Sequence, residues 1–171
     1  MNNEIIEFLR ESNNIEDVWD DLSFQQALFA WCYIIEEDKL TEDILLKTHK
    51  ILMLHQPLQP DEKGYFRKVA VGMNLGNGTF KEFKPWYTVP DLMKQWIVNA
   101  NDLVKNGLGD NEKLLEKINQ EHHVSFGGIH PFIDGNGRMG RILMNWQRYQ
   151  LGMDVLVIKE KEKDKYYQWF N

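Results

Sequence analysis

Cysteine is almost absent from this chain of 171 residues, because Cys32 is the only one. A single cysteine excludes an intrachain disulfide, so the fold depends on its core. Cys32 lies in the apolar run Phe29-Ala30-Trp31-Cys32-Tyr33-Ile34-Ile35. A free cysteine in such surroundings behaves as a small hydrophobic residue, and we expect a buried structural thiol.

The chain also lacks an excess of positive charge and any long hydrophobic run. It has 20 Lys and Arg against 26 Asp and Glu, a formal net charge of −6, so its composition offers no basic face to a nucleic-acid backbone. The first seven residues show neither the basic leader nor the apolar stretch of a signal peptide. We therefore expect a cytoplasmic protein with no nucleic-acid or membrane partner. The sequence is compatible with a monomer or an oligomer.

Internal repeats are missing, as are linkers rich in proline, glycine or serine. Hydrophobic residues make up 43% of the chain, and nine Phe, six Trp and six Tyr supply large apolar side chains. A chain of this length and composition can bury a substantial core. These features predict one domain over residues 1–171.

Helical patterns cover most of the chain. Thr41 predicts a helix N-cap, since two acidic residues follow it and suit the positive end of a helix dipole. Gly127 and Gly128 are expected to end a helix just ahead of His130. The fold class is therefore all-α, a helical bundle. The predicted helices cover about residues 4–10, 15–22, 24–36, 42–55, 88–105, 111–125, 137–150 and 161–170.

One segment, residues 64–87, has a different pattern. Val69, Val71 and Met73 alternate with smaller residues, and Gly76-Asn77-Gly78 then marks a turn before further apolar residues. An Asn-Gly pair between apolar runs is a good signal for a β-hairpin. The pattern predicts one small hairpin, which by itself has a structural role.

Chemistry is concentrated between residues 130 and 141. Gly135 and Gly137 flank Asn136 in a loop that leads into a helix, where close backbone approach and free N–H groups form an anion site. Arg138 and Arg141 lie three residues apart on that helix and share one face. Two guanidinium groups beside a helix N-terminus suit a polyphosphate.

Two further groups complete the set. The Asp134 carboxylate precedes the glycines, and a carboxylate beside a polyphosphate typically holds Mg²⁺. The His130 imidazole titrates near neutrality and can accept a proton from a hydroxyl. Each residue alone fits a surface loop at a helix start, but the complete set predicts nucleotidyl or phosphoryl transfer to a hydroxyl.

The string from His130 to Arg141 resembles the signature of the Fic family, His-x-Phe-x-(Asp/Glu)-Gly-Asn-Gly-Arg-x-x-Arg, at every fixed position. Upstream stretches at 64–69, 88–93 and 123–130 resemble the family as well, so that the likeness runs from about Leu40 to Tyr167. The resemblance implies a Fic fold and a protein adenylyltransferase that uses ATP with Mg²⁺ or Mn²⁺. AMP would pass to a Ser, Thr or Tyr hydroxyl of a target protein, self-modification included.

The resemblance also implies roles for single residues. His130 would be the catalytic base, and Asp134 would bind the metal between the α- and β-phosphates. Phe132 would pack inside and fix the loop. The remaining phosphate ligands would be Asn136, Arg138, the main chain of Gly135 and Gly137, and Arg141 for the γ-phosphate. The hairpin near residues 69–87 would be the flap that aligns the target by strand addition.

Near the N-terminus, Ser12-Asn13-Asn14-Ile15-Glu16-Asp17 resembles the family's inhibitory motif, (Ser/Thr)-x-x-x-Glu-(Gly/Asn), with Asp17 in place of Gly or Asn. The resemblance implies an inhibitory helix at about residues 4–22, in which Glu16 pairs with Arg141 and excludes the γ-phosphate. The same glutamate could instead position a water that removes AMP. Without the resemblance, Glu16 is an ordinary acidic residue near a helix start.

Two other functions remain open: a Doc-like protein kinase, and a nucleotide-binding module without catalysis. Doc-like relatives usually carry lysine at the position of Gly137, and the presence of His130 with Asp134 argues against a module without catalysis. Arg148 is expected to be solvated, and Tyr166 and Tyr167 fit either the adenine site or core packing. The other histidines form no metal pattern, and we expect structural or surface roles for His49, His55, His122 and His123.

Overall fold

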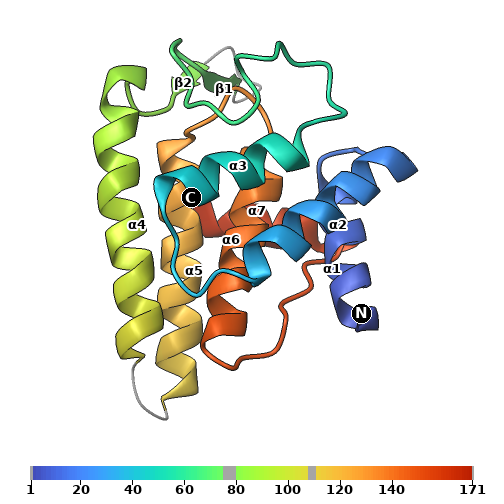
Figure 1. The fold of residues 1–171 in the computed structure, drawn as a ribbon, viewed down its shortest axis with the longest axis vertical. Helices are drawn as coiled ribbons and strands as arrows, with labels where there is room; N and C mark the ends of the chain where they lie inside the picture. The colour runs from blue at the N-terminus through green and yellow to red at the C-terminus, as the bar shows by residue number, and fades with distance from the viewer. Residues whose placement is uncertain (1, 75–79, 108–110, 171) are drawn as a thin grey trace.

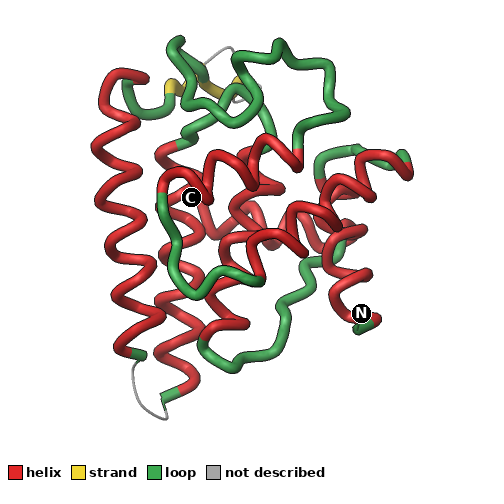
Figure 2. Tube along the Cα trace, in the orientation of Figure 1, coloured by secondary structure: helices red, strands yellow, loops and turns green. Residues whose placement is uncertain are grey.

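The computed structural model describes residues 2–74, 80–107 and 111–170. The all-α fold class with one small hairpin is confirmed, as Figure 2 shows by the predominance of helix. The helices are α1 (Asn3–Ile15), α2 (Asp21–Ile35), α3 (Glu42–Leu52), α4 (Val89–Asn106), α5 (Glu112–Ile129), α6 (Asn136–Gln150) and α7 (Lys163–Tyr167). Three single turns of 3₁₀ helix accompany them, η1 (Trp86–Thr88), η2 (Glu160–Glu162) and η3 (Gln168–Phe170).

Helix α6 lies at the centre of the bundle. Figure 1 shows α4 and α5 side by side along the long axis, with α3 crossing in front of α6 and the hairpin at the upper end. The apolar side of α6 contributes Met139, Ile142, Leu143 and Trp146 to the main core. None of the helices within the described residues is both long and apolar enough to cross a membrane.

The central position of α6 buries polar side chains that a surface helix would expose. Asn145 donates to the Leu156 carbonyl at 3.1 Å and accepts from its N–H at 2.7 Å. Arg148 is only 7% exposed, and its Nε donates to the Asp154 carbonyl at 2.7 Å. The expectation of a solvated Arg148 was wrong, because the chain folds back over the end of α6 and provides a carbonyl partner.

The predicted helix at 15–22, and with it the inhibitory helix at 4–22, was wrong in its extent. Helix α1 ends at Ile15, and Asp17 has φ +56°, a left-handed conformation that cannot continue an α-helix. The next helix then begins independently, because the Asp20 side chain caps α2 by accepting from the Ser23 N–H at 2.8 Å.

Two further expectations fail for packing reasons. Cys32 is exposed, because α2 turns Ala27, Ala30, Trp31 and Ile34 toward the core and Cys32 toward its outer side. The pair Gly127-Gly128 does not end α5, which continues to Ile129. Tertiary contact explains the first of these glycines, since a Cβ on Gly127 would lie 2.5 Å from the Phe170 ring.

The hairpin is confirmed between β1 (Gly72–Asn74) and β2 (Phe80–Glu82), which pair antiparallel with Met73 opposite Lys81. The predicted turn Gly76-Asn77-Gly78 lies outside the described residues. Beyond the strands, the Phe83 N–H donates to the Val71 carbonyl at 3.0 Å and extends the pairing toward the base of the hairpin. Each strand is only three residues long, so other contacts must hold the hairpin in place.

The two glycines of α5 offer a matched test of this packing. We expect Gly127→Ala to lower the free energy of unfolding by about 1–3 kcal/mol, because the methyl group displaces the Phe170 ring. Gly128→Ala should instead raise it by up to about 1 kcal/mol, because a Cβ there meets nothing within 4 Å and alanine favours the helix. Urea unfolding of both variants would show opposite shifts, and equal shifts would contradict the packing described for Gly127.

A second prediction concerns His123, which is buried between α5 and the C-terminal segment with its Nε2 2.8 Å from the Tyr166 hydroxyl. Burial first, and the Arg141 charge second, lower the pKa of His123 from its usual 6.5 to about 3. The unfolded chain therefore binds a proton at this residue near pH 6.5 while the folded chain does not, so stability falls as the pH drops below 6.5.

At pH 5 we expect His123→Gln to reduce proton uptake on unfolding by about one proton. The measurement is the pH dependence of urea unfolding between pH 5 and 7. An unchanged slope in the variant would show that His123 is already protonated in the folded protein.

Candidate functional site

The loop between α5 and α6 carries the motif, and two left-handed residues shape it. His130 ends α5 with φ +53°, and Gly135 precedes α6 with φ +79°. A non-glycine residue in the left-handed region costs about 1–3 kcal/mol and persists only where its surroundings hold it. The chain reverses direction here and presents the first turn of α6, whose leading N–H groups have no partner within the helix.

Asn136 braces this loop from inside. Its Oδ1 accepts from the Phe132 N–H and its Nδ2 donates to the Phe132 carbonyl, both at 2.9 Å. Phe132 is fully buried, as expected, and its ring stacks on that of His49 with centroids 3.6 Å apart. Both polar ends of the Asn136 side chain are thus engaged within the loop, which leaves its main-chain N–H as the group available to a ligand.

His49 fixes the loop from α3. Its Nδ1 accepts from the Gly64 N–H at 3.0 Å, so the proton is on Nε2, which donates to the Asp134 carbonyl at 3.0 Å. Burial lowers the pKa of His49 to about 4 and keeps the ring neutral. The Asp134 carboxylate remains at the surface, 55% exposed, and its Oδ1 accepts from the Gly135 N–H at 2.6 Å.

Arg138 is buried with unused donors. The residue is 2% exposed, yet its Nε and Nη1 have no hydrogen-bond partner among the described residues. Its Nη2 lies 3.7 Å from Asp134 Oδ2 and 3.5 Å from the sulfur of Met53. A buried guanidinium without a full set of acceptors is costly, and its unused donors are suited to an anion.

Arg141, one turn further along α6, has its partners inside the protein. Its Nη2 donates to Glu16 Oε1 at 2.7 Å and to the Ser12 carbonyl at 2.8 Å, and its Nε donates to Ser12 Oγ at 2.9 Å. Its Nη1 donates to the Tyr166 hydroxyl at 3.1 Å. The structure therefore contains the pairing of Glu16 with Arg141 expected from the sequence, and Ser12 takes part in it.

The Glu16 carboxylate lies over the first turn of α6. A Cβ on Gly137 would collide with Glu16 Oε1, so glycine at 137 is what lets the carboxylate come this close to the helix N-terminus. The helix dipole and Arg141 both favour negative charge at this point. Asp17, where the resembling motif has Gly or Asn, adopts the left-handed turn that favours those residues and that aspartate tolerates.

The His130 ring stacks on Phe83, with centroids 3.9 Å apart and planes 9° from parallel. Phe83 follows β2, so the hairpin supplies one wall of the His130 environment. Burial lowers the pKa of His130 to about 4, and the ring is neutral at pH 7. A neutral imidazole has a lone pair with which to accept a proton.

The remaining histidines have structural or surface roles, as expected. The His122 ring bonds Gln147, His123 bonds Tyr166, and His55 lies at the surface 3.6 Å from Asp20. Across the described ranges there is no group of three or more His, Cys, Asp or Glu that could hold a metal ion. A divalent cation at this site would therefore combine the Asp134 carboxylate with oxygen atoms of the substrate, which is a usual arrangement for Mg²⁺.

Three contributors were missed or left undecided by the sequence reasoning. Tyr166 is buried as the partner of Arg141, whereas Tyr167 is 44% exposed. Phe83 contacts His130, and Arg67 donates to the His130 carbonyl at 2.7 Å. The sequence near Phe83 and near Arg67 gave no indication that these residues contact His130, although Arg67 belongs to one of the stretches that resemble the family.

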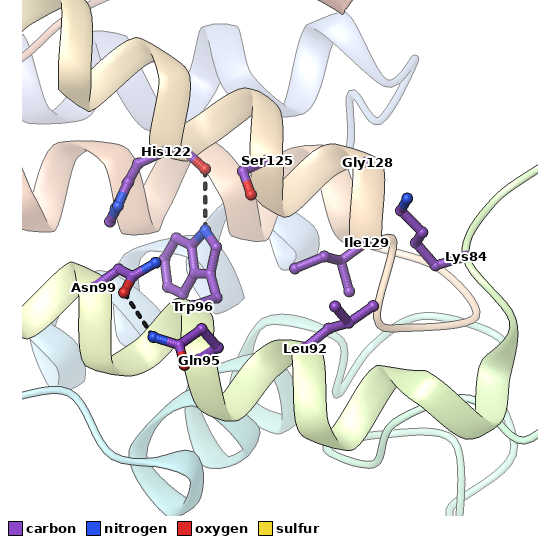
Figure 3. A pocket seen from close by; sticks show the side chains of 9 residues that line it. All are labelled: Lys84, Leu92, Gln95, Trp96, Asn99, His122, Ser125, Gly128 and Ile129. Atoms are coloured by element: carbon purple, nitrogen blue, oxygen red, sulfur yellow. Dashed lines mark hydrogen bonds between the residues drawn. The ribbon is translucent and has the colours of Figure 1, made fainter.

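A groove of about 350 Å³ lies between α4 and α5, apart from the motif (Figure 3). Trp96 forms part of its wall and donates from Nε1 to the His122 carbonyl at 3.0 Å, and Gln95 bonds Asn99 beside it. No residue between 130 and 141 lines this groove. It contributes nothing to the anion site at the start of α6.

Comparison with known proteins agrees with this geometry. A family model described as the Fic/DOC family matches residues 39–147. The protein adenylyltransferase Fic of Drosophila erecta is 27% identical over 144 residues, and that of Drosophila willistoni is 43% identical over 144 residues. Each alignment covers 80% of this chain and 25% of the relative, so the chain spans about a quarter of the length of the curated relatives it matches.

Solved structures show the same fold. A Fic domain containing signaling protein from Bacteroides thetaiotaomicron has a TM-score of 0.83 at 18% identity, covering 97% of this chain and 70% of that one. A Fic family protein from Desulfovibrio desulfuricans has a TM-score of 0.70 at 22% identity, covering 96% of this chain and 55% of that one. Since the family model matches more than half of the chain and ends within the helix that carries Arg138 and Arg141, the chain belongs to the Fic/DOC family.

Proposed function

We propose that this protein is an adenylyltransferase that transfers AMP from ATP to a Ser, Thr or Tyr hydroxyl of a target protein. The observation that carries the proposal is Arg138, a buried guanidinium with two donors that lack a partner among the described residues, beside the leading N–H groups of α6. This is a site for phosphate oxygens. The adenylyltransferase relatives named above support AMP as the transferred group.

In this mechanism His130 removes the proton of the target hydroxyl. The hydroxyl oxygen forms a bond to the α-phosphorus as the bond from that phosphorus to the bridging oxygen breaks, and pyrophosphate leaves with the electron pair. The proton passes to the imidazole, which is neutral and ready to accept it. The negative charge of the bound triphosphate raises the pKa of His130 toward the range in which a general base is most effective.

The phosphates would be held by Arg138 and by the main-chain N–H groups of Asn136 and Gly137, joined by that of Gly135 once it releases the Asp134 carboxylate. Asp134 suits a divalent cation, because its exposed carboxylate provides hard oxygen ligands beside the phosphate site. When bound, Mg²⁺ or Mn²⁺ would shield the phosphate charge and polarise the phosphorus. Arg141 would bind the γ-phosphate once Glu16 has left it.

We further propose that residues 1–171 act as one unit in which α1 restrains catalysis. Glu16 occupies the guanidinium that the γ-phosphate needs, and its charge repels that phosphate. ATP then binds with its α-phosphate turned from in-line attack, a misplacement that costs about 10²-fold in rate. The alternative role for the same carboxylate is to orient a water that would remove AMP from a modified target.

Two alternatives use the same fold. A Doc-like kinase is disfavoured by Gly137, because the Glu16 carboxylate leaves no room for a side chain at that position. A binding module without catalysis is disfavoured by the presence of His130 with Asp134, because a neutral imidazole can accept a proton. Incubation with ATP labelled at the α or the γ position separates the three functions.

We expect the α-label, and not the γ-label, to appear on protein, and His130→Ala to reduce this labelling by about 10²–10⁴-fold. ATP affinity of the variant, measured by calorimetry, should stay within about threefold, because other groups hold the phosphates. Transfer of the γ-label would instead identify a kinase. Normal transfer by His130→Ala would exclude His130 as the base.

Release of the inhibitory contact is a separate prediction. Glu16→Gly should raise AMP transfer, self-modification included, by about 10²-fold, since Arg141 becomes free for the γ-phosphate. Combining it with Arg141→Ala should cancel most of the gain.

The matched control is Asp17→Gly, which changes the neighbouring residue, suits its φ of +56° and leaves the Glu16–Arg141 pair in place. This variant should stay restrained. Equal rates for the parent protein and Glu16→Gly, assayed with α-labelled ATP, would mean that restraint comes from a separate antitoxin-like partner.

A further inference from the structure

Arg67 is a buried cation with no ion pair among the described residues. It is 3% exposed, and its guanidinium is surrounded by main-chain carbonyl oxygens. Its Nε donates to the His130 carbonyl at 2.7 Å and its Nη1 to the Val69 carbonyl at 2.9 Å. Its Nη2 donates to the Lys84 carbonyl at 2.5 Å, with the Ile129 carbonyl at 3.4 Å. A charge this deeply buried is retained only where its donors are satisfied, and here carbonyl dipoles satisfy them.

The acceptors of Arg67 come from three separate parts of the chain. Val69 precedes β1 and Lys84 follows β2, so the guanidinium closes the base of the hairpin. His130 belongs to the motif loop, and the Arg67 main-chain N–H adds a bond to the Pro131 carbonyl at 2.9 Å. One residue therefore joins both legs of the hairpin to the loop that carries the catalytic base.

These contacts act at the two features that set the His130 ring in place. The first is the left-handed main chain of His130, whose carbonyl is oriented by Arg67 Nε. The second is the stacking of Phe83 on the imidazole, and Phe83 directly precedes the carbonyl of Lys84 that Arg67 also holds. A shift of the hairpin relative to the loop would change both features together.

We propose that Arg67 is a positioning residue that holds the hairpin and the His130 main chain as one rigid unit, with Phe83 stacked on the imidazole. This role rests on the proposed function, because it supports the base in that reaction. Lysine cannot replace arginine here, since a single ammonium group cannot span the planar fork that reaches Val69, Lys84 and His130 at once. The geometry of the fork, rather than its charge, is what the site requires.

The test uses the full chain in the Glu16→Gly background, with Arg67→Lys, Arg67→Met and Phe83→Leu. We expect kcat for transfer of α-labelled AMP to fall about 10²-fold in all three, because the base is misplaced. The calorimetric Kd for ATP should stay within about twofold, because Arg67 is not among the phosphate ligands proposed above.

A second readout does not depend on catalysis. A ring stacked at 3.9 Å shifts the His130 ring protons upfield in the NMR spectrum, and this shift should be lost in all three variants. Arg148→Met is the matched control, because Arg148 is also a buried arginine bonded to a carbonyl, at the far end of α6. It should lose thermal stability while keeping kcat, the ATP Kd and the His130 shift.

Each outcome decides the proposal. If Arg67→Met keeps kcat and the upfield shift, or if Arg67→Lys restores both, Arg67 does not position the base through its fork. If Arg148→Met loses as much kcat and shift as Arg67→Met, the effect is only one of lost stability. If the background protein transfers no AMP, the proposed function fails, and the NMR shift still decides whether Arg67 and Phe83 fix the imidazole.

Discussion

Two guanidinium groups, those of Arg138 and Arg141, are buried near the positive end of the central helix, and the organisation of the site follows from how each is neutralised. Arg141 receives a carboxylate from Glu16, two oxygens from Ser12 and the hydroxyl of Tyr166. Arg138 Nη2 lies 3.7 Å from the Asp134 carboxylate and 3.5 Å from the Met53 sulfur, and its other two nitrogens have no partner in the described chain. The Arg141 guanidinium is therefore neutralised within the protein, whereas Arg138 keeps donors that suit an anion in the proposed function.

The neutralisation of Arg141 within the protein accounts for the position of α1 and of the C-terminal segment, residues 159–170. Helix α1 provides Ser12, its C-cap residue Glu16 provides the carboxylate, and Tyr166 near the C-terminus provides its hydroxyl to the same guanidinium. The two segments are also bonded to each other, through Lys159 with Glu7 at 3.1 Å and through the Glu160 N–H with Glu11 at 2.6 Å. Under the proposed restraint, displacing Glu16 from Arg141 would strain contacts on both segments. We therefore expect α1 and the C-terminal segment to move together when the restraint is released.

The hairpin provides contacts that hold His130 in place and that the motif loop does not make by itself. The loop holds His130 in a left-handed conformation, and the hairpin contributes the Phe83 ring and the anchoring of Arg67 around it. In the proposed function, the first turn of α6 and its arginines would bind the phosphates, and the junction of loop and hairpin would hold the base. These two parts meet at Asn136, which braces the loop where it enters α6.

The sequence by itself determined the helical class, the hairpin and the motif, because each depends on residues close together in the chain. The shared face of Arg138 and Arg141 follows from helix periodicity, and the glycines and the Asp134 carboxylate follow from the residue types of the loop just before the helix. The Glu16–Arg141 pair spans 125 residues and was predicted only because both ends resemble a known motif. Tertiary structure alone decided that Arg148 is buried, that Cys32 is exposed and that α5 continues through its two glycines, because packing against distant segments overrides local preference. It also decided the partners of the Arg67 guanidinium, which lie as far as 63 residues away and are carbonyl oxygens that every residue carries, so that no side-chain pattern could mark them.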